Sequence, residues 1–318
     1  MLSDLASLNF GEVPLTAEHQ ALCRWLNGRI PALCARMPTP LRDTALLALQ
    51  IGLCQGSARN VARFYDKYYA PAWTVIPCLA AGTTHRHVNG DRVLDALGAQ
   101  AAAMFLHLLD DHLADGDLPV DHLFLHLRTE AWNEFRACLA RLSEDVPGSE
   151  LIVEPLVERY FTHIHNPPEQ EDLSSYEAVF RGQSATWLIA PLLTAALAGH
   201  GPERQVSLRE MYEEFCLAWR ALDDLRDCAA DAAAGQPTAI FHLLPPRHRN
   251  GWHGVHTDPG ADHERTALLN ALRAGGYVAG ARLIRTHLSN ATALADELQL
   301  PSLAEQYRLL ARPLEELQ

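Results

Sequence analysis

Residues 99–117 read AQAAAMFLHLLDDHLADGD, and residues 214–238 read EFCLAWRALDDLRDCAADAAAGQPT. Each stretch is an apolar run, rich in alanine and leucine, that leads directly into a set of aspartates. Apolar side chains that recur at intervals of three and four residues predict α-helices. We therefore expect two buried helices that carry carboxylates, with the rest of the fold built around them.

The first stretch places Asp110, Asp111 and Asp115 at the end of its apolar helix. Asp111 and Asp115 are four residues apart, so they share one face of the helix, and Asp110 lies beside them. Adjacent carboxylates repel each other and are costly to remove from water, so a counter-charge must offset the cost. Magnesium, which bridges carboxylates and phosphates, supplies such a charge. The alternative interpretation is a solvated helix end.

The second stretch spaces Asp223, Asp227 and Asp231 at intervals of four, which gives one carboxylate stripe along two helical turns. Arg220 and Arg226 could pair with these acids, so an ion-paired surface helix is the alternative interpretation. A metal–diphosphate site inside a helical bundle takes carboxylates from facing helices. Each of the two stretches supplies one side of such a site.

The remainder of the chain also has helical periodicity, interrupted by breaks rich in proline and glycine. No strand pattern, internal repeat or shift in composition divides it. We expect one all-α domain over residues 1–318, with about ten helices in a bundle. The predicted helices are 17–28, 41–55, 57–69, 91–114, 119–141, 150–164, 174–198, 207–233, 265–288 and 291–315.

Composition and charge narrow the class of protein. Hydrophobic residues make up 48% of the chain, and the net charge of -13 argues against nucleic acid as a partner. The seven cysteines are scattered without a CxxC pair, which favours reduced cysteines and a cytoplasmic location. The start of the chain lacks the pattern of a signal peptide. The longest apolar run, 187–199, is too short to span a bilayer, so no membrane segment is expected.

Residues 245–264 differ from their surroundings because they are rich in proline, glycine and histidine. One interpretation is a solvated surface loop. The other is a mobile lid in which Arg247 and Arg249 close over a bound anion.

Three stretches resemble known motifs. Residues 106–117, LHLLDDHLADGD, resemble the first aspartate-rich motif of the trans-isoprenyl diphosphate synthases, the polyprenyl synthetase family of class I isoprenoid synthases. Residues 218–238 resemble the second motif of that family. Residues 176–185, YEAVFRGQSA, resemble the intervening helix, which normally carries a Gly-Lys-Thr step. The order and rough spacing fit over residues 40–240.

This resemblance implies a helical bundle around a deep, central apolar cavity, and an enzyme that is usually a homodimer. It also implies that magnesium ions hold a prenyl diphosphate and neutralise it as it leaves. Asp110, Asp111 and Asp115 would bind two of the ions. Asp223, with Asp227 and Asp231, would bind a third.

The resemblance also suggests further substrate contacts. Phe105 and Leu106 precede the first motif at positions that set the depth of the pocket in this family, so Phe105 suggests a floor and a short prenyl chain. Plain core packing is the alternative for Phe105. Arg181 could contact the departing diphosphate from the middle helix, as an arginine does in terpene cyclases, or it could form a surface ion pair.

The chain departs from the family at the lysines that bind diphosphate. The lysine of Gly-Lys-Thr is Gln183, and the lysine expected after the second motif is Gln236. The early basic step is reduced to Arg42, and no arginine pair follows the first motif. Each lost charge-assisted contact weakens binding by roughly 1.5–3 kcal/mol. We expect ionisation to be retained and elongation with isopentenyl diphosphate to be doubtful.

The sequence therefore predicts a magnesium-dependent enzyme that ionises a short all-trans allylic prenyl diphosphate and transfers the prenyl cation to an acceptor. A terpene cyclase or diphosphate lyase is the nearest alternative. A non-catalytic regulatory subunit of a prenyl diphosphate synthase is the alternative from another class. The presence of both sets of metal-binding acids favours an enzyme.

Overall fold

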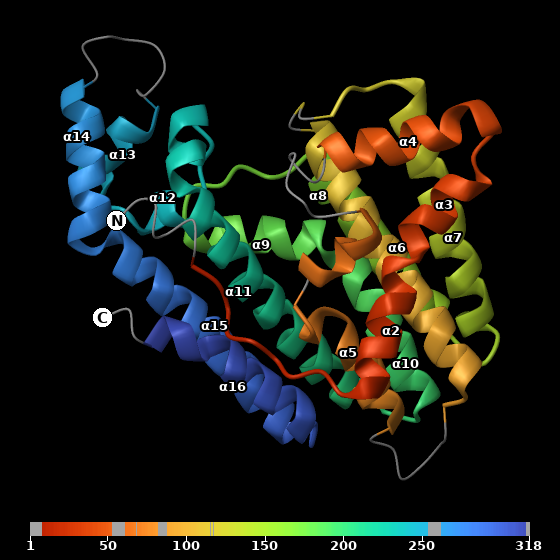
Figure 1. Ribbon diagram of the computed structural model, residues 1–318. Helices are drawn as coiled ribbons and strands as arrows, with labels where there is room; N and C mark the ends of the chain where they lie inside the picture. The colour runs from red at the N-terminus through yellow and green to blue at the C-terminus, as the bar shows by residue number, and fades with distance from the viewer. Residues whose placement is uncertain are drawn as a thin grey trace.

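The computed structural model describes residues 8–52, 61–67, 69–81, 88–114, 116, 118–253 and 262–315. Over these ranges the chain forms helices joined by short connections, and it contains no strand. The expectation of an all-α fold is confirmed. Figure 1 shows α15 and α16 alongside α11 on one side of the bundle, and α2, α3 and α7 around α6 on the other.

Both halves of the chain are helical over the described residues. The first half contributes α2 (Ala17–Asn27), α3 (Arg29–Arg36), α4 (Thr39–Gly52), η1 (Val61–Lys67), α5 (Pro71–Ala81), α6 (Gly90–Ala114) and α7 (His122–Ser143). The second half contributes α8 (Glu150–His165), α9 (Leu173–Gln183), η2 (Ala185–Leu188), α10 (Ile189–Leu197), α11 (Pro202–Ala234), α12 (Ala239–Leu243), α13 (Pro246–His253), α14 (Asp262–Ala271), η4 (Leu272–Gly276), α15 (Tyr277–Glu297) and α16 (Pro301–Glu315).

Helix α6 lies at the centre of the bundle and packs against α5, α7 and α10. It is long and apolar enough to cross a membrane by length and composition alone, yet 78% of its most apolar window is buried inside the protein. Gln100 in the middle of α6 donates hydrogen bonds to the Ala72 carbonyl of α5 and to the Tyr212 hydroxyl of α11. This buried polar junction fixes the relative positions of the three helices.

Local sequence signals account for the ends of the long helices. Helix α11 begins with Pro202 at its first turn and ends at Gly235, whose φ of 70° places it in the left-handed conformation that glycine adopts without strain. Helix α9 begins with a capping box in which the Asp172 carboxylate accepts the Ser175 amide at 2.8 Å. These signals set both ends of α11, which carries the second aspartate stripe, and the start of α9.

Several predicted boundaries are wrong. Helices α3 and α5 are short, contain Pro31 and Pro77, and were not predicted, because proline suppresses the helical pattern. The predicted helix 174–198 is broken where α9 ends at Gln183. The last two helices meet at Leu298–Leu300 rather than near residue 290, around Gln299 with its φ of 56°.

The expected loop at residues 245–264 is partly helical. Helix α13 occupies Pro246–His253, and residues 254–261 lie outside the described residues. Arg249 donates to the carbonyl oxygens of His242 and Leu244 at 2.9 and 3.0 Å, where it caps the end of α12. The Trp252 indole donates to the Gln236 carbonyl at 2.7 Å. Helix α13 therefore packs on the segment after α11, with Arg249 already bonded to backbone.

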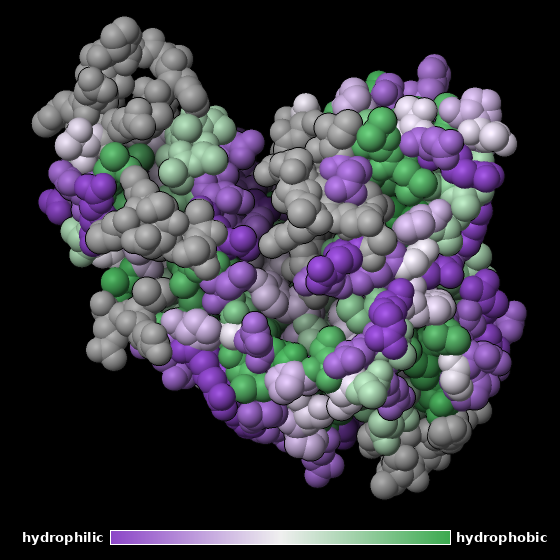
Figure 2. Space-filling view, viewed as in Figure 1, coloured by the Kyte–Doolittle hydropathy of each residue, from purple (hydrophilic) through white to green (hydrophobic). Residues whose placement is uncertain are grey.

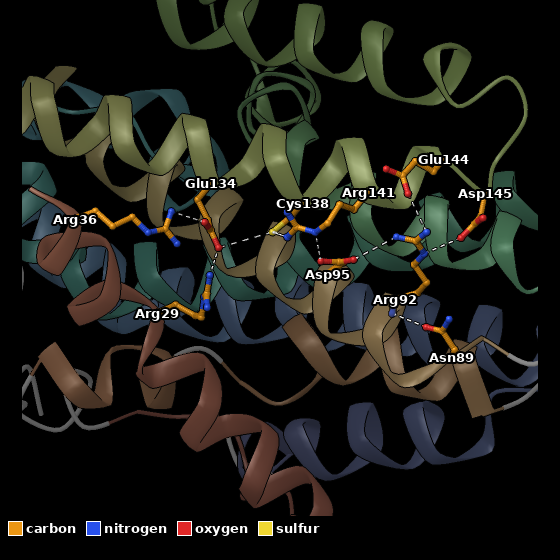
Figure 3. A network of polar contacts seen from close by, with 10 residues as sticks. All are labelled: Arg29, Arg36, Asn89, Arg92, Asp95, Glu134, Cys138, Arg141, Glu144 and Asp145. Carbon is orange, nitrogen blue, oxygen red and sulfur yellow. Dashed lines mark hydrogen bonds and ion pairs between the residues drawn. The ribbon is translucent and has the colours of Figure 1, made fainter.

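A network of ion pairs joins α3, α6 and α7 (Figure 3). It includes none of the aspartates of the two motifs. Glu134 of α7 is buried and pairs with Arg29 and Arg36 of α3. Near the start of α6, Arg92 pairs with Glu144 and Asp145, while Asp95 pairs with Arg141 of α7. Burying Glu134 without its partners would be costly, so this network secures the packing of α3 on α7.

Candidate active site

Residues from both aspartate-rich stretches meet in a region between α6, α9 and α11. A cavity of about 200 Å³ lies there, with Asp111 of α6 on one wall and Arg220 of α11 on another. Tyr176, Phe180 and Gln183 of α9 line it as well, and the segment Gln236–Thr238 after α11 completes it. The cavity thus takes lining residues from both of the predicted stretches, Asp111 from the first and Arg220 from the second.

Figure 2 shows a hollow in the surface of the bundle. The hollow lies between the lobe that carries α13 and α14 and the opposite lobe that carries α4 and α8, as they are placed in Figure 1. The cavity itself is smaller and more polar than the deep apolar cavity expected from the sequence, because glutamine, arginine and aspartate side chains line it.

Asp110 is almost completely buried, at 5% exposure, and points away from the cavity residues towards α7 and α8. Arg128 of α7 pairs with both of its carboxylate oxygens, one of them at 3.0 Å. The Tyr160 hydroxyl of α8 donates to the carboxylate at 2.6 Å. The hydrogen bond with Asp110 raises the pKa of Arg128, so the guanidinium stays charged.

Asp111 is half-buried and lines the cavity. Within the described ranges its carboxylate makes no hydrogen bond and no ion pair. Adjacent side chains on a helix diverge by about 100°, which is why Asp110 and Asp111 face different neighbours. Asp115, the third acid of the first motif, lies outside the described residues.

The second pair is arranged in the same way. Asp224 is 2% exposed and accepts hydrogen bonds from the Tyr176 hydroxyl at 2.7 Å and from the Ala239 amide at 2.9 Å. The Arg220 Nε lies 2.9 Å from the Asp224 carboxylate and 2.9 Å from the Tyr176 oxygen. Asp223, its neighbour, is half-buried and has no hydrogen bond or ion pair among the residues described.

The other two acids of the second stripe are more exposed than Asp224. Asp227 is exposed and Asp231 is half-buried. Burial, and then the charge of Asp224, raise the pKa of Asp231 to about 7. The stripe therefore concentrates negative charge that a cation would stabilise.

Arg220 connects the two aspartate pairs electrostatically. Burial alone would lower its pKa, but Tyr176, Asp224, Asp111 and Asp223 together raise it well above the ordinary value. Asp111 of α6 also lines the cavity together with Arg220. Its Cζ lies 5.7 Å from the centre of the Phe180 ring. The sequence indicated Arg220 only as a possible ion-pair partner, a role that its contact with Asp224 confirms.

Aromatic side chains pack behind the cavity wall formed by Phe180. The Phe180 ring stacks on Trp219 at 6.4 Å, and Trp187 contacts Trp219 at 5.8 Å. His107 of α6 lies 5.2 Å from Trp187, and its Nδ1 lies 3.1 Å from the Gln183 carbonyl. Burial lowers the pKa of His107, so it is neutral at pH 7. Electron-rich faces therefore back the cavity.

The predicted substrate contacts fall in different places. Gln183 lines the cavity together with Asp111, and so does Gln236. Phe105 and Leu106 are fully buried, and Phe105 packs edge-to-face on Phe64 of η1 at 5.7 Å. These two side chains are not among the residues that line the cavity.

Two predicted arginines are also placed apart from it. Arg181 lies 3.6, 3.7 and 3.3 Å from the carboxylates of Glu177, Glu213 and Glu214. It therefore forms ion pairs, as in the second of the two interpretations given for this residue. Arg42 lies on α4, which packs on α3 and α7. Neither arginine lines the cavity.

Three of the four side chains that bind the buried aspartates were not predicted. Arg128, Tyr160 and Tyr176 lie 18, 50 and 48 residues from the aspartates that they bind, and only Arg220 is on the same helix. No local spacing in the sequence connects such distant residues. A tyrosine buried inside an amphipathic helix would be the one available signal.

The chemistry of the free acids fits a hard divalent cation. Asp111 and Asp223 offer unpaired carboxylate oxygens, which magnesium prefers. Over the described residues, no group of three or more His, Cys, Asp or Glu side chains is arranged to hold a metal ion by itself. A metal ion here would therefore take further oxygens from water or from a phosphorylated ligand.

A larger cavity of about 650 Å³ lies elsewhere. It is lined by residues that include Phe10, Tyr65 and Trp73, next to the segment that runs from the N-terminal region to α2. None of the aspartates of the two motifs lines it.

Comparison of the whole fold with known structures gives consistent neighbours. Geranylgeranyl pyrophosphate synthase from Corynebacterium glutamicum matches with a TM-score of 0.68 and 15% identity, over 98% of each chain. Polyprenyl synthase from Caulobacter crescentus, complexed with calcium and isoprenyl diphosphate, matches with a TM-score of 0.66 and 14% identity, over 98% of this chain and 97% of that chain. Geranylgeranyl pyrophosphate synthetase from Pyrococcus horikoshii matches with a TM-score of 0.66 and 12% identity, over 97% and 98%.

No family model and no curated protein matches the sequence. The structural matches extend over nearly the full length of both chains, so the chain has the all-α isoprenoid synthase fold of these polyprenyl and geranylgeranyl pyrophosphate synthases. The resemblance inferred from the motifs is confirmed at the level of the fold.

Proposed function

We propose that this protein is a magnesium-dependent isoprenoid synthase that ionises a short all-trans allylic prenyl diphosphate and transfers the prenyl cation to an acceptor. One observation carries the proposal. Asp111 of the first motif helix and Arg220 of the second motif helix line the same cavity, and the charges of Asp111 and Asp223 both raise the pKa of Arg220.

The aspartates and Arg220 would have different roles in ionisation of the substrate. Asp111 and Asp223 would hold magnesium ions, together with Asp115, Asp227 and Asp231, and bound magnesium would neutralise the departing diphosphate. Arg220 supplies the one fixed positive charge among the described cavity-lining residues and would orient the diphosphate. By analogy with the polyprenyl synthetase family, we propose that these acids bind three magnesium ions.

The aromatic wall suits the other product of ionisation. An allylic cation needs a water-poor environment that stabilises positive charge without reacting with it. The stacked rings of Phe180 and Trp219 provide such a surface directly behind Arg220. The prenyl chain requires more room than about 200 Å³, so substrate entry would displace side chains at this wall.

The same wall, with neutral Gln183 and Gln236 in place of lysines, favours a second candidate. A terpene cyclase or diphosphate lyase needs one diphosphate site, and the described cavity holds one arginine. A non-catalytic regulatory subunit has no need of the unpaired acids Asp111 and Asp223. We further propose a cytoplasmic homodimer, as for the resembling family.

A product assay distinguishes these functions. The purified protein is incubated with magnesium and geranyl, farnesyl or geranylgeranyl diphosphate, with and without isopentenyl diphosphate, and the products are identified by mass spectrometry. Prenyl transfer predicts a coupled product only when an acceptor is present. Hydrocarbon or alcohol from the allylic substrate alone would establish the cyclase or lyase. Absence of pyrophosphate release under every condition would overturn the proposal of an enzyme.

A further inference from the structure

The two aspartate pairs share an arrangement that the motif alone does not contain. In each pair one carboxylate is buried and bound by one arginine and one tyrosine hydroxyl. For Asp110 these are Arg128 and Tyr160, and for Asp224 they are Arg220 and Tyr176. The other member of each pair, Asp111 or Asp223, is half-buried without a hydrogen bond or ion pair to any described residue.

The buried members have little capacity left for a metal ion. Both oxygens of Asp110 accept from Arg128, and one of them also accepts from Tyr160. Asp224 accepts from Tyr176 and from the Ala239 amide through one oxygen and pairs with Arg220 through the other. A cation at either carboxylate would have to displace a guanidinium in a buried environment, which costs more than binding the free neighbour.

We propose that each aspartate pair is divided between a positioning residue and a metal ligand. Asp110 and Asp224 fix the orientation of their helices through the arginine and tyrosine contacts, whereas Asp111 and Asp223 ligate the cations. Arg128, Tyr160 and Tyr176 are then positioning residues too, because they hold the buried aspartate that sets the direction of its neighbour. This inference rests on the proposed function and gives Asp110 a different role from the metal ligand expected from the sequence.

Counting bound ions tests the division. Manganese binding is measured by electron paramagnetic resonance in the presence of inorganic pyrophosphate, which gives both the number of ions and their affinity. Asp111→Asn and Asp223→Asn should each reduce the number of ions bound at saturation. Asp110→Asn and Asp224→Asn should bind the wild-type number, with affinity lower by about ten-fold because positioning is lost.

Two tyrosine variants keep the test valid if an asparagine variant fails to fold. Tyr160→Phe and Tyr176→Phe remove only a hydroxyl, and each should weaken manganese binding about ten-fold without changing the number of ions. The loss caused by Tyr160→Phe should vanish when Asp111→Asn is already present. Tyr212→Phe is the matched control, since this buried hydroxyl donates to the Ala72 carbonyl at 2.7 Å and does not contact either aspartate pair.

The outcomes separate this inference from the proposed function. Fewer ions in Asp110→Asn or Asp224→Asn, or tyrosine variants that bind manganese as Tyr212→Phe does, would overturn the division between positioning and ligand residues. A wild-type protein that binds no manganese with pyrophosphate would overturn the proposed function together with it.

Discussion

At the scale of single residues, the aspartate motifs show how neighbours in sequence acquire different surroundings. Asp223 and Asp224 are adjacent, yet Asp223 is half-buried without a hydrogen bond or ion pair to any described residue, and Asp224 is 2% exposed against α9 and α12. The helical rotation of about 100° per residue produces this difference. A carboxylate count from the sequence therefore overestimates the number of oxygens available to a cation.

The neutral amides in the cavity lead to a prediction about anion affinity. Gln183 and Gln236 both line the cavity, so Gln183→Lys with Gln236→Lys would place two cations near Arg220. We expect pyrophosphate to bind at least about ten-fold more tightly, because each charge-assisted contact contributes roughly 1.5–3 kcal/mol. Isothermal titration calorimetry with magnesium and pyrophosphate measures the change.

The control is Gln205→Lys, which adds one positive charge near the other end of α11 and is compared with Gln183→Lys alone. Its side chain bonds to the His200 carbonyl at 2.9 Å, away from the cavity. An equal gain in affinity from Gln205→Lys would mean that net charge, rather than these two positions, controls binding.

At the scale of elements, the close approach of α8 and α9 depends on Gly182. A Cβ added there would lie 2.1 Å from the His163 ring of α8, so Gly182→Ala forces the two helices apart. Overpacking of this kind typically costs about 1–3 kcal/mol of folding free energy. Urea denaturation should show this loss, together with reduced activity because Gln183 and Phe180 move with α9.

Gly90→Ala provides the comparison, since nothing lies within 4 Å of the added Cβ and the residue begins α6. We expect its midpoint of denaturation to stay near that of the wild type. If Gly182→Ala were equally stable, the packing of α8 on α9 described here would be incorrect.

Helix α15 is attached to α9 and α11 by a buried histidine. His287 Nδ1 lies 2.9 Å from Glu214, and its Nε2 lies 3.3 Å from Glu177. Burial alone would lower the pKa of His287, but these two carboxylates outweigh it and raise the pKa to about 9. The charged imidazolium therefore stabilises the docking of α15, since its pKa is higher in the folded than in the unfolded chain.

The sign of this shift predicts a pH dependence of stability. The contribution is fully present below the unfolded pKa of about 6.5, decreases as pH rises, and is lost as pH passes about 9. We expect thermal unfolding to shift to lower temperature over this window. His287→Gln should unfold at lower temperature at pH 6 and lose this part of the dependence. An unchanged profile in the variant would contradict a charged His287.

At the scale of the whole molecule, the helical class and the buried, central position of residues 99–114 follow from the sequence. Periodic apolar faces and capping signals such as Pro202 and Gly235 act locally, so they can be detected without a structure. Helices α3 and α5 were missed because Pro31 and Pro77 resemble breaks in the sequence, while their burial against the core supports helix in the folded protein.

The candidate site could be predicted only in part, for a related reason. Asp111, Asp223 and Gln183 carry signals that lie within a motif. Arg128 and Tyr160 come from α7 and α8, and their contact with Asp110 exists only after the bundle forms. Arg181 has the residue type expected of a diphosphate ligand, but three nearby carboxylates of α9 and α11 engage it. Tertiary contacts therefore decided which charged residues remain available.

Release of pyrophosphate is the measurement that tests the central claim most directly. We expect the wild-type protein with magnesium to release pyrophosphate from an allylic prenyl diphosphate. Asp111→Asn and Asp223→Asn should lower the rate at least about 100-fold without loss of the folded state. Asp296 is an exposed residue of α15 that pairs with Arg308, and Asp296→Asn should leave the rate unchanged. Release that persists in Asp111→Asn and Asp223→Asn, or its absence in the wild type with every allylic diphosphate, would contradict the account.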